Sequence, residues 1–330
     1  MTALALQIAL CALLIGRAGS VLSESADRIA RAPGETGGWM GLALLATVTS
    51  LPELASGISA VTIIDAPNLA VGNVLGACVF NLLCLVGIDA LQRRQPIYHQ
   101  ASAAHLLSAA FGVVMLGFVA MSLLMDRRAP AFLHLGLYSP ALLALYLLAL
   151  RSVFSHERAM HQPDPDAASL APSLPREWRR FGLAALVVLA AGTWLPFLAD
   201  QLATTMGWSR SFVGTLFMAL VTTLPEIVVT LSALRLGALD MAIGNLLGSN
   251  LFNVTILAID DLFYTRGPLL ADADSVHAST AIAAVVMTGL VMIGLVMRPQ
   301  GRVLRVLSWV SVGLMGIYVL NATLVFIYAS

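Results

Sequence analysis

The sequence predicts an all-α membrane protein whose ten transmembrane helices form two inverted five-helix repeats, with some helices broken near the centre. Three observations carry this prediction: the composition, the number of apolar runs and a motif that occurs twice. Hydrophobic residues make up 59% of the 330 residues, only 11% are charged, and the mean hydropathy is +0.88. A soluble protein of this length needs a more charged surface, so several membrane spans are expected.

Apolar runs long enough to cross a bilayer predict ten spans. Five lie on each side of a polar, proline-rich stretch at 152–180, which we expect to be a flexible linker. The first repeat then covers 1–151 and the second covers 181–330. Because five is an odd number, the second repeat enters the bilayer from the opposite side. The expected spans are 3–22, 39–64, 69–91, 101–125, 131–150, 181–202, 211–234, 241–262, 278–297 and 303–328.

The arginines indicate the orientation of the chain. There is no lysine, so all 18 basic residues are arginine. If both termini lie outside, thirteen arginines fall in inner loops, four in outer loops, and Arg17 lies within the first span. Such an excess of positive charge inside is the bias that orients membrane proteins. We therefore expect both termini outside and the linker in the cytoplasm.

A two-part motif of the first repeat recurs in the second, with equivalent residues 172 or 173 positions apart. Such regular spacing indicates a genuine internal repeat. The first part runs Ala46-Thr47-Val48-Thr49-Ser50-Leu51-Pro52-Glu53 in one copy and Ala219-Leu220-Val221-Thr222-Thr223-Leu224-Pro225-Glu226 in the other. The second part begins Gly72-Asn73 and ends at Asn81 in one copy, and begins Gly244-Asn245 and ends at Asn253 in the other.

Of the eighteen acidic residues, Glu53 and Glu226 lie well inside apolar segments, whereas the others fall in loops or near the ends of spans. An ionisable group within a membrane is costly, so it marks a functional site by default. The structural alternative is an interhelical hydrogen bond or an ion pair with Arg17. Because the two glutamates occupy equivalent positions, we expect them to meet and build one site.

The prolines and threonines beside the glutamates add oxygen ligands. Pro52 and Pro225 each remove a backbone donor and free carbonyl oxygens one turn earlier. Thr49 and Thr222 lie four residues before each glutamate and hence on the same helix face. Carboxylate, hydroxyl and carbonyl oxygens suit hard cations such as Ca²⁺, Na⁺ or Mg²⁺. A simple kink with a back-bonded hydroxyl is the alternative explanation.

The second part of the motif supplies further polar groups. Asn73 and Asn245 mark a second break in each half. Asn81 and Asn253 place uncharged oxygen donors deeper in the same spans. An isolated asparagine commonly joins helices by hydrogen bonds, but the repetition beside the glutamates favours a role as ligand or gate.

The paired motifs resemble the α-repeats of the cation/Ca²⁺ exchanger superfamily, and most closely its prokaryotic sodium/calcium exchanger branch. Those repeats read Gly-Thr-Ser-x-Pro-Glu, followed by Gly-Asn-x-x-Gly-Ser-Asn-x-x-Asn/Asp. The motif resemblance covers 39–81 and 212–253. It implies an integral protein of a bacterial or archaeal cytoplasmic membrane that alternates access by sliding the spans at 3–22 and 181–202.

The resemblance also implies a set of ligands for the transported ions Ca²⁺ and Na⁺. The implied metal ligands are Glu53, Glu226, Thr49, Thr222, Ser249, Asn81, Asn253 and the carbonyl oxygens of Ala46 and Ala219. The implied supporting positions are Ser50, Thr223, Pro52, Pro225, Asn73 and Asn245.

Five positions depart from the family pattern, and two of them, Val48 and Val221, replace the glycine of the first motif. Ala77 stands where the first repeat of the family has serine, so one Na⁺ hydroxyl is missing, whereas Ser249 keeps it in the second repeat. Cys78 replaces the neighbouring asparagine. Asn253 stands where several relatives have aspartate, which leaves two carboxylates in the expected site. These departures leave H⁺ as an alternative to Na⁺.

The function that we expect is a secondary antiporter that exchanges Ca²⁺ for Na⁺. Ca²⁺/H⁺ exchange, or exchange of another divalent cation, is the alternative on the same scaffold. A channel, an intramembrane enzyme with the two glutamates as acid and base, and a structural scaffold are less favoured. The expected partners are inorganic cations and the lipid bilayer, with no nucleic acid and no cofactor.

Overall fold

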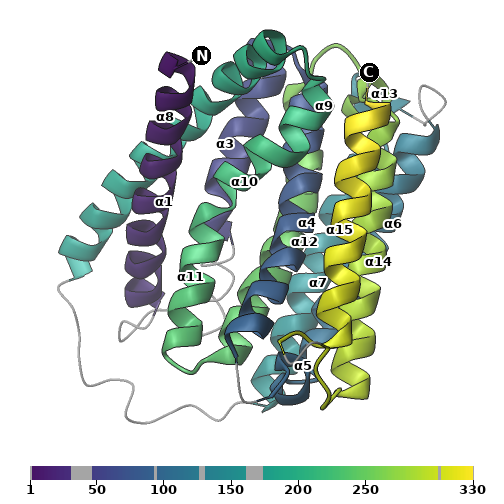
Figure 1. Cartoon of the computed structure of the whole chain (residues 1–330). Coiled ribbons are helices and arrows are strands. Elements are labelled where there is room, and N and C mark those ends of the chain that lie inside the picture. The colour runs from purple at the N-terminus through teal and green to yellow at the C-terminus, as the bar shows by residue number, and fades with distance from the viewer. Residues whose placement is uncertain are drawn as a thin grey trace.

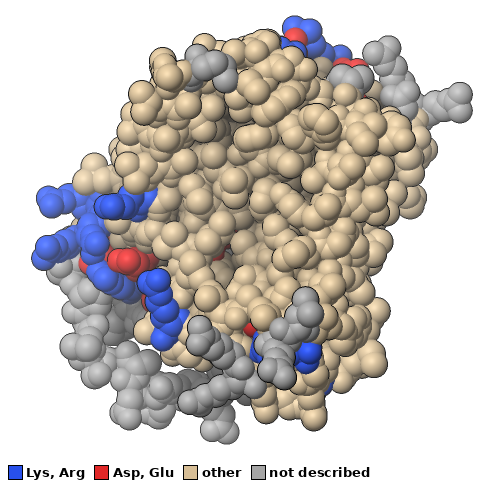
Figure 2. Space-filling model, in the orientation of Figure 1, with Lys and Arg blue, Asp and Glu red and all other residues tan. Residues whose placement is uncertain are grey.

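The computed structural model describes residues 2–30, 47–92, 95–125, 131–160, 174–303 and 306–329, and within these ranges the protein is almost entirely helical (Figure 1). Long helices run side by side, and a two-stranded antiparallel hairpin joins β1 (Ala131–Phe132) to β2 (Leu135–Gly136). Figure 2 shows charged side chains at the top edge, the lower left and the bottom of one face, with a broad surface between them that is almost free of charged side chains. An uncharged surface of this kind suits contact with lipid.

Seven helices of the described residues are long and apolar enough to cross a membrane. They are α1 (Thr2–Ala30), α4 (Pro67–Leu91), α6 (His105–Met125), α8 (Leu174–Met206), α12 (Leu239–Phe263), α14 (Val276–Met297) and α15 (Trp309–Tyr328). A pair of helices bent by 44° brings the number to eight if it is counted as one span. It contains α9 (Arg210–Phe212), the π-helical η4 (Val213–Met218) and α10 (Ala219–Thr222) before the bend, and α11 (Leu224–Arg235) after it.

Shorter apolar helices occupy the places of the other two expected spans. α3 (Leu51–Ser59) continues into the π-helical η1 (Ala60–Ile64), and the first part of this expected span lies outside the described residues. α7 (Tyr138–Met160) begins later than the expected 131, because 131–136 form the hairpin. The number of ten complete spans therefore stays a prediction.

Both ends of the expected linker are helical, which corrects the boundaries predicted at 152–180. α7 continues to Met160 and α8 begins at Leu174, so only 161–173 lies outside the described residues. Pro175 occupies the first turn of α8, where its missing N–H removes no helical hydrogen bond. Proline and charge therefore marked the beginning of a helix here, and not only a linker.

α4 and α12 form the centre of the molecule, where 72% and 83% of their most apolar stretches are buried. Cys78 of α4 meets Asn250 of α12, which is its equivalent 172 residues later: Asn250 Nδ2 donates to the Cys78 carbonyl at 3.2 Å. A residue that contacts its own equivalent lies near the axis that relates the two copies. This contact supports the predicted two-fold relation between the halves. Each central helix is followed by a one-turn helix, α5 (Ile97–Gln100) or α13 (Leu269–Asp272).

α1 and α8 pack along each other outside this centre, and each contacts the other half of the chain through a glycine. A Cβ on Gly19 of α1 would overlap the ring of Pro225, and a Cβ on Gly192 of α8 would lie 3.1 Å from the Pro52 carbonyl oxygen. Gly19 and Gly192 are 173 positions apart, so these contacts are equivalent. The first helix of each half thus lies against the proline break of the opposite half.

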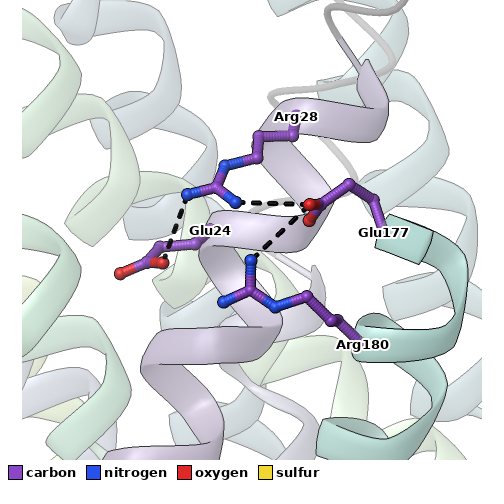
Figure 3. Close-up of polar contacts among 4 residues, drawn as sticks. All are labelled: Glu24, Arg28, Glu177 and Arg180. Carbon is purple, nitrogen blue, oxygen red and sulfur yellow. Dashed lines mark hydrogen bonds and ion pairs between the residues drawn. The ribbon is translucent and has the colours of Figure 1, made fainter. Parts of the chain in front are cut away.

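Charged side chains join α1 to α8 near one end of the bundle (Figure 3). Arg28 Nη1 of α1 lies 3.3 Å from Glu177 Oε1 of α8, and Arg28 Nη2 lies 3.7 Å from Glu24 Oε2. Arg180 Nη1 reaches the same Glu177 oxygen at 3.5 Å. Of these contacts, the pair of Arg28 with the buried Glu177 links α1 to α8, whereas the other two lie within one helix each.

Candidate functional site

The two glutamates of the repeated motif begin two helices at the centre of the molecule. Glu53 lies in the first turn of α3 and Glu226 in the first turn of α11, each directly after a proline, and both are 0% exposed. A carboxylate is favoured there, because the first N–H groups of a helix carry partial positive charge. The two side chains lie close enough to interact electrostatically. The breaks therefore bring two carboxylates of opposite halves into one region.

Hydroxyl groups cross from one half to the other at this point. Ser50 Oγ donates to Glu226 Oε1 at 3.0 Å. The hydroxyl of Thr222 lies beside the Glu53 carboxyl. Thr49 Oγ1 and Ser249 Oγ lie 3.2 Å apart. Each carboxylate therefore has a hydroxyl group of the other half beside it, and the site is complete only when both halves are in place.

Several oxygen atoms of the site have no hydrogen-bond partner among the described residues. They are both carboxylate oxygens of Glu53, Glu226 Oε2, Asn81 Oδ1 and Asn253 Oδ1. All of these side chains are 0% exposed. Buried polar atoms are nearly always paired in native proteins, so a cluster of unpaired ones needs an explanation. Oxygen atoms with free lone pairs are the ligands that Ca²⁺ and Na⁺ take.

Asn73 and Asn245 lie inside the continuous helices α4 and α12, so the second break expected at these positions is not found, and their side chains join helices instead. Asn73 Oδ1 accepts a hydrogen bond from Thr222 Oγ1 at 3.0 Å, and Asn73 Nδ2 donates to Ser56 Oγ at 3.0 Å. In the second half, Asn245 Nδ2 donates to Thr230 Oγ1 at 3.4 Å. Asn73 and Asn245 thus hold the carboxylate-bearing helices against α4 and α12.

The departure at Ala77 changes the contacts of the site. Thr49 pairs with Ser249, and the equivalent pair would join Thr222 to position 77, where alanine has no hydroxyl. Thr222 donates to Asn73 instead. The two halves of the site are therefore related in position but differ in their hydrogen bonds.

The predicted carbonyl ligands are those of Ala219 and Ala46. The Ala219 carbonyl accepts hydrogen bonds from Thr222 Oγ1 at 3.2 Å and from Thr223 Oγ1 at 2.7 Å. Threonine hydroxyls readily bond back to the preceding turn, so the oxygen that the proline was expected to free is occupied in this conformation. Ala46 lies outside the described residues.

Sequence reasoning placed Asp260 among acidic residues near the ends of spans, but this side chain is 0% exposed and neither carboxylate oxygen has a partner among the described residues. Alignment of the two copies could have singled out Asp260, because its equivalent is Ile88 and the acidic residue therefore occurs in one half only. The ion pair considered for Arg17 is not found: among the described ion pairs, none joins Arg17 to Glu53 or Glu226.

Curated relatives match most of the chain. The putative antiporter CaxA of Alkalimonas amylolytica is 29% identical, over 81% of this chain and 82% of that protein. The sodium/calcium exchanger MaX1 of Methanosarcina acetivorans is 25% identical, over 90% of this chain and 91% of the relative. The inner membrane protein YrbG of Escherichia coli K12 is 26% identical, over 69% and 72%.

Solved structures share the fold. The sodium-calcium exchanger NCX_Mj soaked with 2.5 mM Na⁺ and 1 mM Sr²⁺ superposes with a TM-score of 0.65 at 20% identity, over 98% of this chain and 99% of the other. Native YfkE superposes with a TM-score of 0.65 at 16% identity, over 97% and 91%. The family profile described as sodium/calcium exchanger protein matches residues 3–153 and 178–326. The chain therefore belongs to the sodium/calcium exchanger protein family.

Proposed function

We propose that this protein is a secondary active antiporter that exchanges Ca²⁺ for Na⁺ across the membrane by alternating access. One observation carries the proposal: Glu53 and Glu226, which are equivalent residues of two repeats, lie buried within electrostatic range of each other, and three of their four carboxylate oxygens are unpaired among the described residues. The relatives named as antiporter and exchanger support the same class of function.

The charges favour obligatory exchange. Two carboxylates balance one Ca²⁺, and Na⁺ ions can neutralise the same pair. Moving the pair through a closed state without a cation would bury uncompensated charge, which is strongly unfavourable. Access therefore switches when either ion is bound, so that the flux of one ion depends on the other.

α1 and α8 are the elements that we assign to the gate. They contact the proline breaks through Gly19 and Gly192, where the absence of a side chain lets one helix lie close against another. α1 and α8 pack along each other, and Glu177 of α8 holds Arg28 of α1, so we expect the two helices to move as one unit. A shift of this unit would expose the carboxylates to one side or the other.

The test is Ca²⁺ transport in proteoliposomes with Na⁺ and H⁺ gradients imposed separately. An outward Na⁺ gradient should drive Ca²⁺ uptake, and Glu53→Gln or Glu226→Gln should abolish it. Asp240→Asn is the matched control, because Asp240 is an exposed carboxylate at the start of α12, outside the site and the gate helices. Normal uptake by either glutamine variant of the site would contradict the proposal.

Ca²⁺/H⁺ exchange remains the second candidate, and the observation that favours it is the missing hydroxyl at Ala77. Without this hydroxyl, Thr222 donates to Asn73 and one expected Na⁺ ligand is lost. Ca²⁺ uptake driven by a pH gradient in the absence of Na⁺ would support this candidate. Ca²⁺ flux without any counter-ion would indicate a channel.

A further inference from the structure

Asp260 of α12 is a third fully buried carboxylate whose charge nothing in the proposed exchange site uses. Its side chain lies against α3 at Gly57, where a Cβ would stand 2.7 Å from Asp260 Oδ1 and closer still to Oδ2. Neither oxygen has a hydrogen-bond partner among the described residues. An ionised carboxylate buried in this way needs a neutralising cation or a proton.

The next residue, Asp261, differs from Asp260 in its hydrogen-bond partners. Asp261 is equally buried, but its oxygens accept hydrogen bonds from the backbone N–H groups of Gly136 and Leu269 and from the hydroxyls of Tyr138 and Ser139. Asp261 is therefore compensated by the protein. Asp260 is not, so burial alone does not account for its presence.

Asp260 lies on the same faces of α3 and α12 as two residues of the exchange site. Gly57 follows Glu53 by four residues, so the Asp260 carboxyl meets α3 on the face of Glu53, one turn or about 6 Å further along. On α12, Asp260 follows Asn253 by seven residues, which places both on one face about 10 Å apart. The unpaired oxygens of Glu53, Asn253 and Asp260 thus lie along the contact between α3 and α12, with Asp260 nearest to the end of α12.

This carboxylate occurs at one end only. The equivalent of Asp260 is Ile88, and the equivalent of Gly57 is Thr230. Ile88 is 1% exposed, and the Thr230 hydroxyl accepts a hydrogen bond from Asn245. The corresponding position of the other half is therefore apolar and packed, and the two ends of the path are chemically different.

We propose that Asp260 forms an accessory Ca²⁺ site between the Glu53–Glu226 pair and the side of the membrane where α12 ends. A carboxylate with two free oxygens suits a hard cation. The site is closed in this conformation and fills when the path opens to that side, where it holds Ca²⁺ before the ion reaches the glutamates. This inference rests on the proposed exchange of Ca²⁺, and it predicts tighter apparent Ca²⁺ binding from one face than from the other. With the predicted orientation of the chain, that face is the outer one.

The first test measures the half-saturating Ca²⁺ concentration of exchange at each face, in right-side-out and inside-out vesicles. At the face where α12 ends, Asp260→Asn should raise the half-saturating Ca²⁺ concentration about tenfold, which is the loss of affinity typical of removing a metal-binding partner. At the other face, the half-saturating Ca²⁺ concentration should be unchanged. Asp240→Asn is the matched control, because Asp240 is an exposed carboxylate at the opposite end of the same helix. Equal values for Asp260→Asn and the unaltered protein at both faces, or an equal rise at both faces, would overturn the inference.

The second test is equilibrium binding of ⁴⁵Ca²⁺ to purified protein that carries Glu53→Gln and Glu226→Gln together. Weak binding should remain and should be lost when Asp260→Asn is added. Binding that is unaffected by this third substitution would refute the accessory site. If Asp260→Asn does not fold, Gly57→Ala tests the same contact, because the new methyl group displaces the Asp260 carboxyl. The separate outcome in which Glu53→Gln alone still exchanges Ca²⁺ would refute the proposed function itself.

Discussion

Two pairs of buried carboxylates differ in how many hydrogen bonds the protein donates to them. Glu53 and Glu226 lie at the centre, and Asp89 and Asp261 lie at the ends of α4 and α12. Both pairs are repeated along the chain and fully buried. Asp89 accepts hydrogen bonds from Ile97 N at 3.1 Å and from Ser308 N and Ser311 Oγ at 2.7 Å. In the central pair, Glu226 Oε1 accepts a hydrogen bond from Ser50 Oγ at 3.0 Å, and the other three carboxylate oxygens have no partner among the described residues.

This difference shows that repetition and burial do not by themselves identify an ion site. Asp89 and Asp261 bind the backbone N–H eight residues later, at Ile97 and Leu269, and so hold α5 and α13 at the ends of the central helices. Their charge is balanced by donors that the chain supplies. Unpaired oxygens, rather than acidity, distinguish the glutamates from these structural aspartates.

The largest expected effect separates transport from stability at the centre. Glu226→Gln should reduce Ca²⁺ exchange by about 100-fold or more, as expected when a metal ligand is lost, while the melting temperature without Ca²⁺ stays the same or rises. The amide removes a buried charge that has few partners. Thermal unfolding followed with and without Ca²⁺ checks this, since Ca²⁺ should stabilise only the unaltered protein. A large fall in stability without Ca²⁺ would place Glu226 with the structural carboxylates.

The opposite effect is expected at the ends of the central helices. Asp261→Asn should lower the free energy of unfolding by about 1–3 kcal/mol, because an amide cannot accept all the hydrogen bonds made by Gly136, Tyr138, Ser139 and Leu269. Thermal unfolding in detergent measures this change. Ca²⁺ affinity should be unchanged in the protein that remains folded, and a selective loss of affinity would contradict the structural role.

A smaller effect sharpens the difference between the two halves of the site. Ala77→Ser restores the hydroxyl that Ser249 supplies in the other half. One added ligand oxygen, worth about 1 kcal/mol, should lower the half-saturating Na⁺ concentration of exchange about fivefold. Ser249→Ala is the reciprocal variant and should raise it. If both variants leave the Na⁺ dependence unchanged, these positions do not bind Na⁺.

The smallest effect concerns the ion pairs between α1 and α8. Arg28→Ala removes contacts to Glu24 and Glu177, but the Arg28 side chain is 44% exposed and Arg180 still reaches Glu177. The free energy of unfolding should therefore fall by less than about 1 kcal/mol. Exchange rates should change more than stability, because the pair of Arg28 with Glu177 joins the two gate helices. A rate identical to that of the unaltered protein would argue against coupled movement.

Much of the fold could be predicted from the sequence, because hydropathy and the repeat report on long stretches of chain. Seven expected spans appear as single helices, and the bend before Glu226 follows from Pro225. The start of α7 was missed, since a short hairpin among apolar residues has no distinct pattern. The helical ends of the linker were missed because proline at the first turn of a helix resembles proline in a loop.

The site was predictable in its residues but not in its pairings. Glu53 and Glu226 stand out as acids in apolar segments, and the motif adds the threonines and asparagines. That Ser50 donates to Glu226 depends on how two distant segments pack, which no local pattern reports. The burial of Asp260 was missed for the same reason, because its position near the end of a span looks exposed until α3 covers it.

The contact between Ser50 and Glu226 joins residues 176 positions apart, and this has a consequence for biosynthesis. At a typical rate of 5–20 residues per second, the ribosome needs roughly 10 to 35 s to reach Glu226 after it has passed Ser50. During that interval the segment that carries Glu53 enters the membrane before any of its partners from the second half has been made. The nascent chain must therefore tolerate an unassembled acidic helix, and a premature stop in the second half would leave it permanently without its complement.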